Sequence, residues 1–121
     1  MAINELYIYT NGVLISRRLI TKESGEAITP SDIASVTLNV YKLTLDDVGV
    51  YQRTKIHTAS ITPSDIVTAQ VEEDAYGLEY NFNYCAENVF TIPNTLYLVE
   101  YILVDVFGHN IVVTAKGRTQ D

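Results

Sequence analysis

Residues 78–85 read Leu-Glu-Tyr-Asn-Phe-Asn-Tyr-Cys, and this stretch gives the clearest sign of the fold. Every second side chain is apolar or aromatic, namely Leu78, Tyr80, Phe82 and Tyr84. Successive side chains of a β-strand point to opposite faces, so a period of two places these four on one face. A helical period would scatter them. The stretch therefore predicts a strand with one face in the core.

The same alternation appears in residues 36–43, where Val36, Leu38 and Val40 are expected to face inward. A longer apolar run, residues 96–107, is expected to pair with residues 111–115 through a tight turn around Gly108. Short strands separated by turn residues at intervals of roughly 8 to 12 residues are typical of β-sandwiches and small barrels. We therefore expect a single all-β domain over residues 1–121.

The N-terminal residues carry a hairpin signal. Residues 6–9 and 13–15 are extended in character and flank Asn11-Gly12, the dipeptide that tolerates the two positive φ angles of a type I′ turn. This predicts an N-terminal β-hairpin within residues 1–20, which either packs on its own domain or serves as an arm that reaches a neighbour. At the other end, residues 116–121 are expected to form a polar tail.

Composition narrows the function. The net charge is −7 and the basic residues are scattered, which argues against a nucleic-acid partner because phosphates require clustered positive charge. A single cysteine, Cys85, indicates folding in a reducing compartment. We see neither a signal-peptide pattern nor a membrane span, and expect synthesis in a cytoplasm. Charged residues make up 19%, below the roughly 25% of average domains, so some surface is expected to be covered.

The run 96–107 is apolar on both faces, since Tyr97 and Tyr101 oppose Val104 and Val106. Such a strand is either central with both faces covered, or part of an interface. Tyrosine suits interfaces because it combines a large rigid ring with a polar end. The interface candidates are Tyr7, Tyr9, Tyr97, Tyr101, Val104 and Val106, and the alternative is that the tyrosines fill the core.

Catalytic chemistry has little support. A nucleophile needs an adjacent base, and the sequence offers one candidate nucleophile, Cys85, and two candidate bases, His57 and His109. We predict no enzyme activity, no catalytic or metal-binding residue and no cofactor. The acidic clusters at residues 46–47 and 72–74 are expected to be solvated turns, although grouped carboxylates can also hold calcium.

One hexapeptide occurs twice. Ile28-Thr29-Pro30-Ser31-Asp32-Ile33 recurs as residues 61–66, and an extended run follows each copy. Proline presets φ, and Ser or Asp can bond the backbone two residues on. The physical interpretation is a shared device for entering a strand, and two copies are too few for a repeat fold.

Taken together, residues 32–44, 77–82 and 98–101 give a pattern of strand openings and aromatic positions. This pattern resembles small immunoglobulin-like structural proteins of tailed bacteriophage particles, over roughly residues 31–115. The resemblance implies an immunoglobulin-like antiparallel β-sandwich. It also implies a virion component: a capsid cement or decoration protein, a neck or tail accessory subunit, or a fibre-attachment domain.

The first hypothesis is therefore a non-enzymatic structural protein of a phage-like particle, located in the virion. Its expected partners are other virion proteins, such as major capsid, neck or tail subunits, and further copies of itself, with no nucleic acid or membrane. The alternative is a β-sandwich module that recognises carbohydrate or a receptor, with or without calcium. A small hydrolase using Cys85 and a histidine is the third hypothesis.

Overall fold

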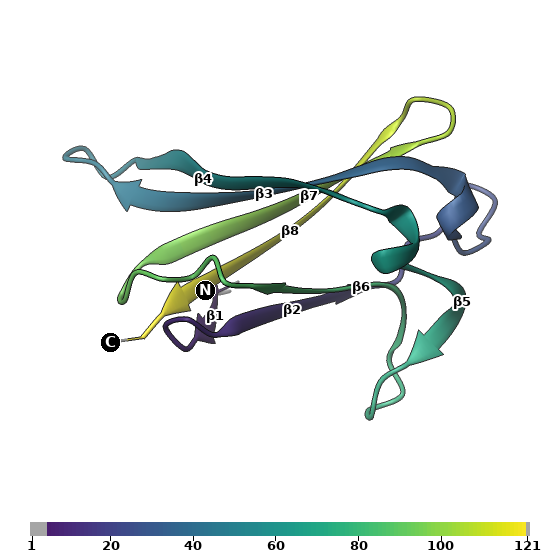
Figure 1. Cartoon of the computed structure of the whole chain (residues 1–121), viewed down its shortest axis with the longest axis horizontal. Coiled ribbons are helices and arrows are strands. Elements are labelled where there is room, and N and C mark those ends of the chain that lie inside the picture. Colours follow the sequence, from purple (N-terminus) through teal and green to yellow (C-terminus); the bar gives the residue numbers. More distant parts are fainter. Residues whose placement is uncertain (1–4, 121) are drawn as a thin grey trace.

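The computed structural model describes residues 5–120, which are built almost entirely of β-strands (Figure 1). The strands are β1 (Glu5–Ile8), β2 (Val13–Arg18), β3 (Ile33–Leu45), β4 (Tyr51–Ile61), β5 (Val67–Glu73), β6 (Glu79–Glu87), β7 (Leu96–Asp105) and β8 (Asn110–Thr119). Short 3-10 turns η1 (Pro30–Asp32) and η2 (Pro63–Asp65) precede β3 and β5. Within the described range, no helix is long and apolar enough to cross a bilayer. The prediction of an all-β domain is confirmed.

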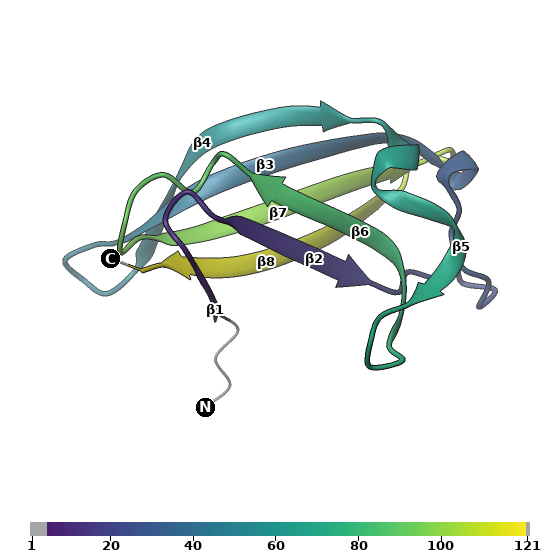
Figure 2. The ribbon, with the colours of Figure 1, turned by 60° about the horizontal axis from the view of Figure 1, so that its bottom comes forward.

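The strands form two sheets packed face to face, as Figure 2 shows. The larger sheet has the order β1-β8-β7-β3-β4, and the smaller has the order β2-β6-β5. In a variable-type immunoglobulin domain, strand C′ extends the sheet of G, F and C, while B, E and D belong to the other sheet. Assigning β2 to β8 to strands B, C, C′, D, E, F and G in chain order reproduces both sheets. The immunoglobulin-like sandwich is confirmed, with β1 parallel to β8 at one edge and the other described pairings antiparallel.

The predicted N-terminal hairpin is wrong, and the chain turns at Asn11-Gly12 without the type I′ geometry, because Gly12 lacks a positive φ. Asn11 has a φ of 62°, and the Gly12 amide donates a hydrogen bond to the Tyr9 carbonyl oxygen at 2.6 Å. The chain crosses between the sheets at this turn, because β1 pairs with β8 whereas β2 pairs with β6. An alternating pattern shows which face of a strand is buried and not which strand lies beside it.

The predicted polar tail is also wrong over residues 116–119, which continue β8. Residues 5–8 pair with residues 116–119 one for one. Thr119 is buried, and its hydroxyl donates to the Ile92 carbonyl oxygen at 2.6 Å. The first and last strands therefore close one edge of the larger sheet.

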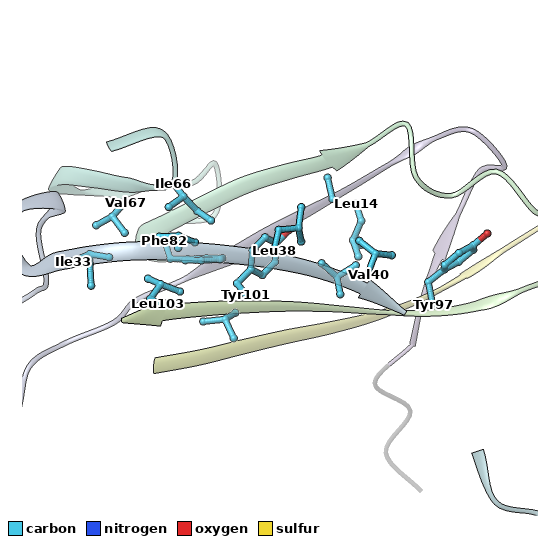
Figure 3. Packing of buried hydrophobic residues seen from close by; sticks show 14 of the residues in the cluster. Leu14, Ile33, Leu38, Val40, Ile66, Val67, Phe82, Tyr97, Tyr101 and Leu103 are labelled. Atoms are coloured by element: carbon cyan, nitrogen blue, oxygen red, sulfur yellow. The ribbon is translucent and has the colours of Figure 1, made fainter. Parts of the chain in front are cut away.

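The core lies between the sheets, with β3 and β7 at its centre (Figure 3). Val36, Leu38 and Val40 of β3 lie beside Leu103, Tyr101 and Val99 of β7, and all six are buried. From the smaller sheet, the Phe82 ring meets the Tyr101 ring edge-on, with centroids 5.1 Å apart. The inward orientation predicted for β3 is confirmed.

Tyr97 fixes the start of β7. Its hydroxyl oxygen accepts a hydrogen bond from the Ile92 amide at 3.1 Å, and the Phe90 ring packs edge-on at 5.2 Å. A tyrosine near the start of strand F that bonds the backbone a few residues upstream is a hallmark of immunoglobulin domains. Two residues later, where antibody domains have a disulfide cysteine, this chain has the buried Val99.

The alternation predicted for residues 78–85 holds only in the second half. Phe82 is buried and Tyr84 packs against the core, as predicted. Leu78 is exposed, and the Arg17 guanidinium lies 4.7 Å from the centre of the Tyr80 ring, which is partly exposed. The pairing of β5 with β6 shifts register between Val67 and Glu72, and strict alternation ends there.

Asn81 is fully buried, although the period of two placed its neighbour Tyr80 on the core face and Asn81 on the polar face. Its side-chain oxygen accepts from the Ile20 amide at 2.8 Å, and its amide group donates to the carbonyl oxygens of Ile20 and Ile28 at 2.8 and 3.0 Å. A buried amide is stable when hydrogen bonds satisfy it. These three bonds attach the connection between β2 and β3 to β6.

The two copies of the hexapeptide form η1 and η2, which lie beside each other. In the first copy the Asp32 carboxylate accepts from the Thr29 amide at 2.8 Å and lies 3.3 Å from the Lys22 ammonium. The Thr29 bond is the main reason that the pKa of Asp32 is lowered. Because each copy leads directly into a strand, the predicted strand-entry role is confirmed.

Candidate functional site

The outward side of β3, β4, β7 and β8 forms a surface that we call the open face. The smaller sheet lies on the other side of these strands, and no described segment crosses this surface in Figures 1 and 2. By strand register, the open face consists of Thr37, Asn39, Tyr41, Leu43, Arg53, Lys55, Thr58, Ser60, Leu96, Leu98, Glu100, Ile102, Val104, Val112, Thr114, Lys116 and Arg118.

The apolar part of the open face comes mainly from β7. Leu98, Ile102 and Val104 are half-buried by neighbours within the sheet, and Val112 of β8 is exposed beside Ile102. β7 is a central strand, between β8 and β3, but described elements do not cover both of its faces. The smaller sheet covers one face, and the other, which carries Glu100 among its apolar residues, has no described element above it.

A polar network lies in the middle of the open face. The Glu100 carboxylate accepts from the Asn39 amide group at 3.2 Å and from the Tyr41 hydroxyl at 3.4 Å, while the Thr58 hydroxyl donates to the Asn39 side-chain oxygen at 2.8 Å. The Arg53 guanidinium lies 4.5 Å from the centre of the Tyr41 ring. These contacts hold the side chains in fixed positions, so the face is preorganised for binding.

The open face is basic although the chain is acidic. It carries Arg53, Lys55, Lys116 and Arg118, four of the eight cations of the chain. Among its described side chains, Glu100 supplies the single carboxylate, out of fifteen acidic residues in the sequence. A partner with an acidic surface would therefore be attracted to this face.

A hollow lies where the open face meets the end of the sandwich. It measures about 350 Å³. Its lining, which defines what we call the end hollow, is Lys42, Leu43, Thr44, Leu45, Tyr51, Asn94, Thr95, Leu96 and Arg118. By strand register Leu43, Leu96 and Arg118 share the outer side of the sheet, whereas Lys42 pairs with Tyr97 and belongs to the inner side. Because Leu96 is buried, the end hollow offers a mixed polar and apolar surface.

Three hairpin turns in the described range share one geometry. They begin at Asp46, Asp74 and Asp105, and each has glycine three residues later with φ between 78° and 86°. In each turn the aspartate carboxylate accepts from the backbone amides two and four residues ahead, at 2.8 to 3.0 Å. These bonds are the main reason that the pKa values of Asp46 and Asp105 are lowered. The turns are therefore rigid supports for whatever residue lies at the tip.

Each turn presents a bulky apolar side chain. Val48, Tyr76 and Phe107 occupy the same position and are 82%, 91% and 81% exposed. Single exposed apolar side chains are normal on protein surfaces, so these three do not mark a contact site by themselves. The expected turn is confirmed at residues 46–47, whereas in the second cluster Glu72 and Glu73 belong to β5 and the turn begins at Asp74. The Asp46 and Asp74 carboxylates accept hydrogen bonds from backbone amides.

A second cleft, of about 390 Å³, lies at the opposite end of the sandwich. It separates the connection before β3 from the turn between β7 and β8. Ile28, Ile33 and Ile111 supply part of its apolar lining. The Asp105 carboxylate lies 3.2 Å from the His109 ring nitrogen at its rim. In an immunoglobulin variable domain, binding loops occupy this end.

The structure divides the predicted interface residues. Tyr9 and Val106 are exposed, and Val104 lies half-buried on the open face. The side chain of Tyr7 lies outside the described residues, although its backbone belongs to β1. Tyr97 and Tyr101 are 0% exposed, so their assignment to an interface is wrong. They face the smaller sheet, because the charged Glu100 occupies the other side of β7.

Tyr101 is a core residue with an isolated hydroxyl. Burial raises its pKa to about 12. The Ser16 hydroxyl lies nearby and opposes this shift, but neither hydroxyl has a partner at hydrogen-bonding geometry among the described residues. Tyr101 therefore contributes packing rather than a polar contact.

Residues considered for catalysis are separated. Cys85 is exposed on β6 of the smaller sheet, and the depression beside it is lined by neither histidine. His57 lies on β4 of the larger sheet, and His109 follows the turn between β7 and β8. Within residues 5–120, no group of three or more His, Cys, Asp or Glu side chains is arranged to hold a metal.

Two features were missed from the sequence. The shared turn is visible in hindsight as Asp followed three residues later by Gly, at residues 46–49, 74–77 and 105–108. The concentration of cations on one face could not be predicted. Arg53 and Lys116 are far apart in the sequence, and they reach the same face of the sheet only because β4 pairs with β3 and β8 pairs with β7.

No family model, curated protein or solved structure matches this chain. The fold assignment therefore stands on strand order, register and the tyrosine at the start of β7.

Proposed function

We propose that the protein is a non-enzymatic structural subunit of a phage-like particle, which docks on another particle protein through the open face. The observation that carries this proposal is the outer side of β7, where Leu98, Ile102 and Val104 flank a fixed polar network with no described element above them. The resemblance of residues 31–115 to phage immunoglobulin-like proteins supplies the kind of assembly.

The physical properties of the face suit this role. Interfaces combine an apolar centre with a polar rim and bind better when the side chains are already ordered. On the open face, most apolar residues lie on the central strands and Val112 lies on β8, whereas the cations Arg53 and Lys116 lie on β4 and β8. The cations would orient an acidic partner, and the apolar residues would supply most of the affinity.

A co-sedimentation assay tests the proposal with a matched pair of variants. Val112 is 54% exposed on the open face, and Ile15 is 53% exposed on the outer side of the smaller sheet. We expect purified protein to pellet with particles or tail tubes that lack it, and we expect Val112→Glu to lose this association while Ile15→Glu keeps it. Circular dichroism would verify that both variants are folded.

Two results would contradict the proposal. The wild-type protein could fail to pellet with every capsid, neck and tail assembly of the particle. Alternatively, Val112→Glu could pellet as well as the wild type, which would show that the open face is not the docking surface.

A further inference from the structure

Glu100 places a carboxylate in the middle of the open face. On the outer side of β7 it lies between Leu98 and Ile102, and its neighbour in β8 is Thr114. The centres of protein interfaces are depleted of charged residues, so a charge at this position is unusual. Glu100 therefore restricts which surfaces can cover the open face.

The protein itself hydrogen-bonds only one oxygen of this carboxylate. The Asn39 amide group and the Tyr41 hydroxyl both donate to Oε1 of Glu100, at 3.2 and 3.4 Å, which is at or beyond the upper end of the usual range. An ionised carboxylate has about four acceptor sites on its two oxygens. In the described part of the chain no hydrogen bond reaches Oε2, and this atom is not among the buried unpaired ones. Oε2 is therefore solvated in the free protein.

The cations of the open face do not neutralise Glu100. The Arg53 guanidinium lies over the Tyr41 ring, 4.5 Å from its centre. Lys116 is paired with Leu98 in the register of β7 and β8, rather than with Glu100. Among the described side chains, the ion pairs lie elsewhere in the molecule and Glu100 takes part in none. Its charge is thus compensated by solvent.

Docking would remove this compensation. A partner that covers the open face separates Oε2 from water, and a buried charge is costly unless an opposite charge pairs with it. We propose that the docking partner places one basic side chain, arginine or lysine, against Oε2 of Glu100, so that an ion pair lies at the centre of the interface. The inference rests on the proposed function, because it names the chemistry of the partner that docks there.

The surroundings of Glu100 define the rest of the expected partner surface. Thr114 is exposed beside Glu100 and offers a second acceptor to a guanidinium, which has several donors in a planar fork. Arg53 and Lys116 lie on either side of β7 and favour acidic groups at the edge of the contact. A uniformly acidic surface would bring a like charge to Glu100. The matching surface has a basic side chain at its centre, flanked by acidic ones.

Glu100→Gln tests the inference by the sign of its effect. Glutamine keeps the size of the side chain and an oxygen for the Asn39 and Tyr41 bonds, but it removes the charge. In co-sedimentation with particles that lack the protein, we expect the dissociation constant to rise at least about tenfold, because the partner's cation is left unpaired. Without such a cation, the loss of a charge that must be desolvated leaves the affinity unchanged or raises it. Either of these two results would overturn the inference.

Glu100→Leu gives a second test, because it joins the apolar residues Leu98 and Ile102 into one patch. A partner with an apolar centre would bind this variant more tightly than the wild type. A partner with a basic side chain there should bind it at least as weakly as Glu100→Gln. Tighter binding of Glu100→Leu would therefore contradict the ion pair.

Glu87→Gln is the matched control. Glu87 is exposed on the outer side of the smaller sheet, opposite Val13, and its replacement changes the net charge by the same amount. This variant should pellet like the wild type. A loss equal to that of Glu100→Gln would mean that net charge, and not a specific ion pair, governs the association, which would also overturn the inference. Circular dichroism of all three variants would verify folding.

The same assay separates failure of the inference from failure of the proposed function. If Val112→Glu loses the association and Glu100→Gln keeps it, the open face docks without the ion pair, and only the inference is overturned. If the wild type does not pellet, or Val112→Glu pellets as well as the wild type, no partner covers Glu100 and both are overturned.

Discussion

The Tyr101 hydroxyl is buried without a hydrogen-bond partner in the described structure, and its pKa is raised from 10.0 to about 12. Between pH 10 and 12 the unfolded state loses this proton and the folded state keeps it, so stability falls as the pH rises. The expected loss is about 2 to 3 kcal/mol. Tyr101→Phe should abolish this part of the alkaline loss, as measured by urea unfolding at pH 9, 10, 11 and 12. Parallel pH profiles of the two proteins would show that the shift is absent.

Phe82 tests the packing between the sheets. It is fully buried and meets Tyr101 edge-on. Phe82→Ala should reduce the free energy of unfolding by about 3 to 5 kcal/mol, because it leaves a cavity at the centre of the core. Phe82→Leu is the control and should cost clearly less. A loss below about 1 kcal/mol for Phe82→Ala in denaturant unfolding would mean that the ring does not fill the core.

At the scale of elements, the shared turns depend on glycine in a left-handed conformation. Gly77 has a φ of 78°, and nothing lies within 4 Å of where a Cβ would stand. Gly77→Ala should therefore cost about 1 kcal/mol through backbone strain alone. Gly77→Asn should cost less, since asparagine tolerates this conformation better. Equal thermal unfolding of the alanine variant and the wild type would contradict the turn geometry.

The aspartates of these turns predict a response to acid. Backbone hydrogen bonds lower the pKa values of Asp46 and Asp105 below the usual 3.8. The folded state then binds fewer protons than the unfolded state, so their contribution is complete above pH 3.8 and is lost as the pH falls through the lowered values. Asp105→Asn should flatten the acid limb of the stability profile. An unchanged acid limb in this variant would show that the carboxylate is not engaged.

The elements also show what could be predicted from the sequence. The alternation in residues 36–40 identified a strand and its buried face, because the side chains of a strand point alternately to its two faces. The turn residues before β8 identified where the last strand begins. The partner of each strand leaves no such mark, which is why β1 and β2 were assigned to one hairpin. For β7, Glu100 could have identified the outer face, since an unpaired charge in the core is costly. Tyr97 and Tyr101 lie on the other face of β7 from Glu100, so both tyrosines belong to the core.

At the scale of the whole molecule, the outer side of the larger sheet is the surface that no described element covers. The open face lies on this side, and the end hollow lies where it meets one end of the sandwich. The sequence indicated surplus apolar surface and an acidic chain, whereas the cations of β4 and β8 gather only when the sheet forms.

Electron cryo-microscopy of the assembled particle containing this chain tests the central claim most directly. The account predicts that the open face, with Leu98, Ile102 and Val112, is buried against another protein, while the outer side of the smaller sheet is turned away from it. A reconstruction in which the open face of every copy is turned to solvent would contradict it.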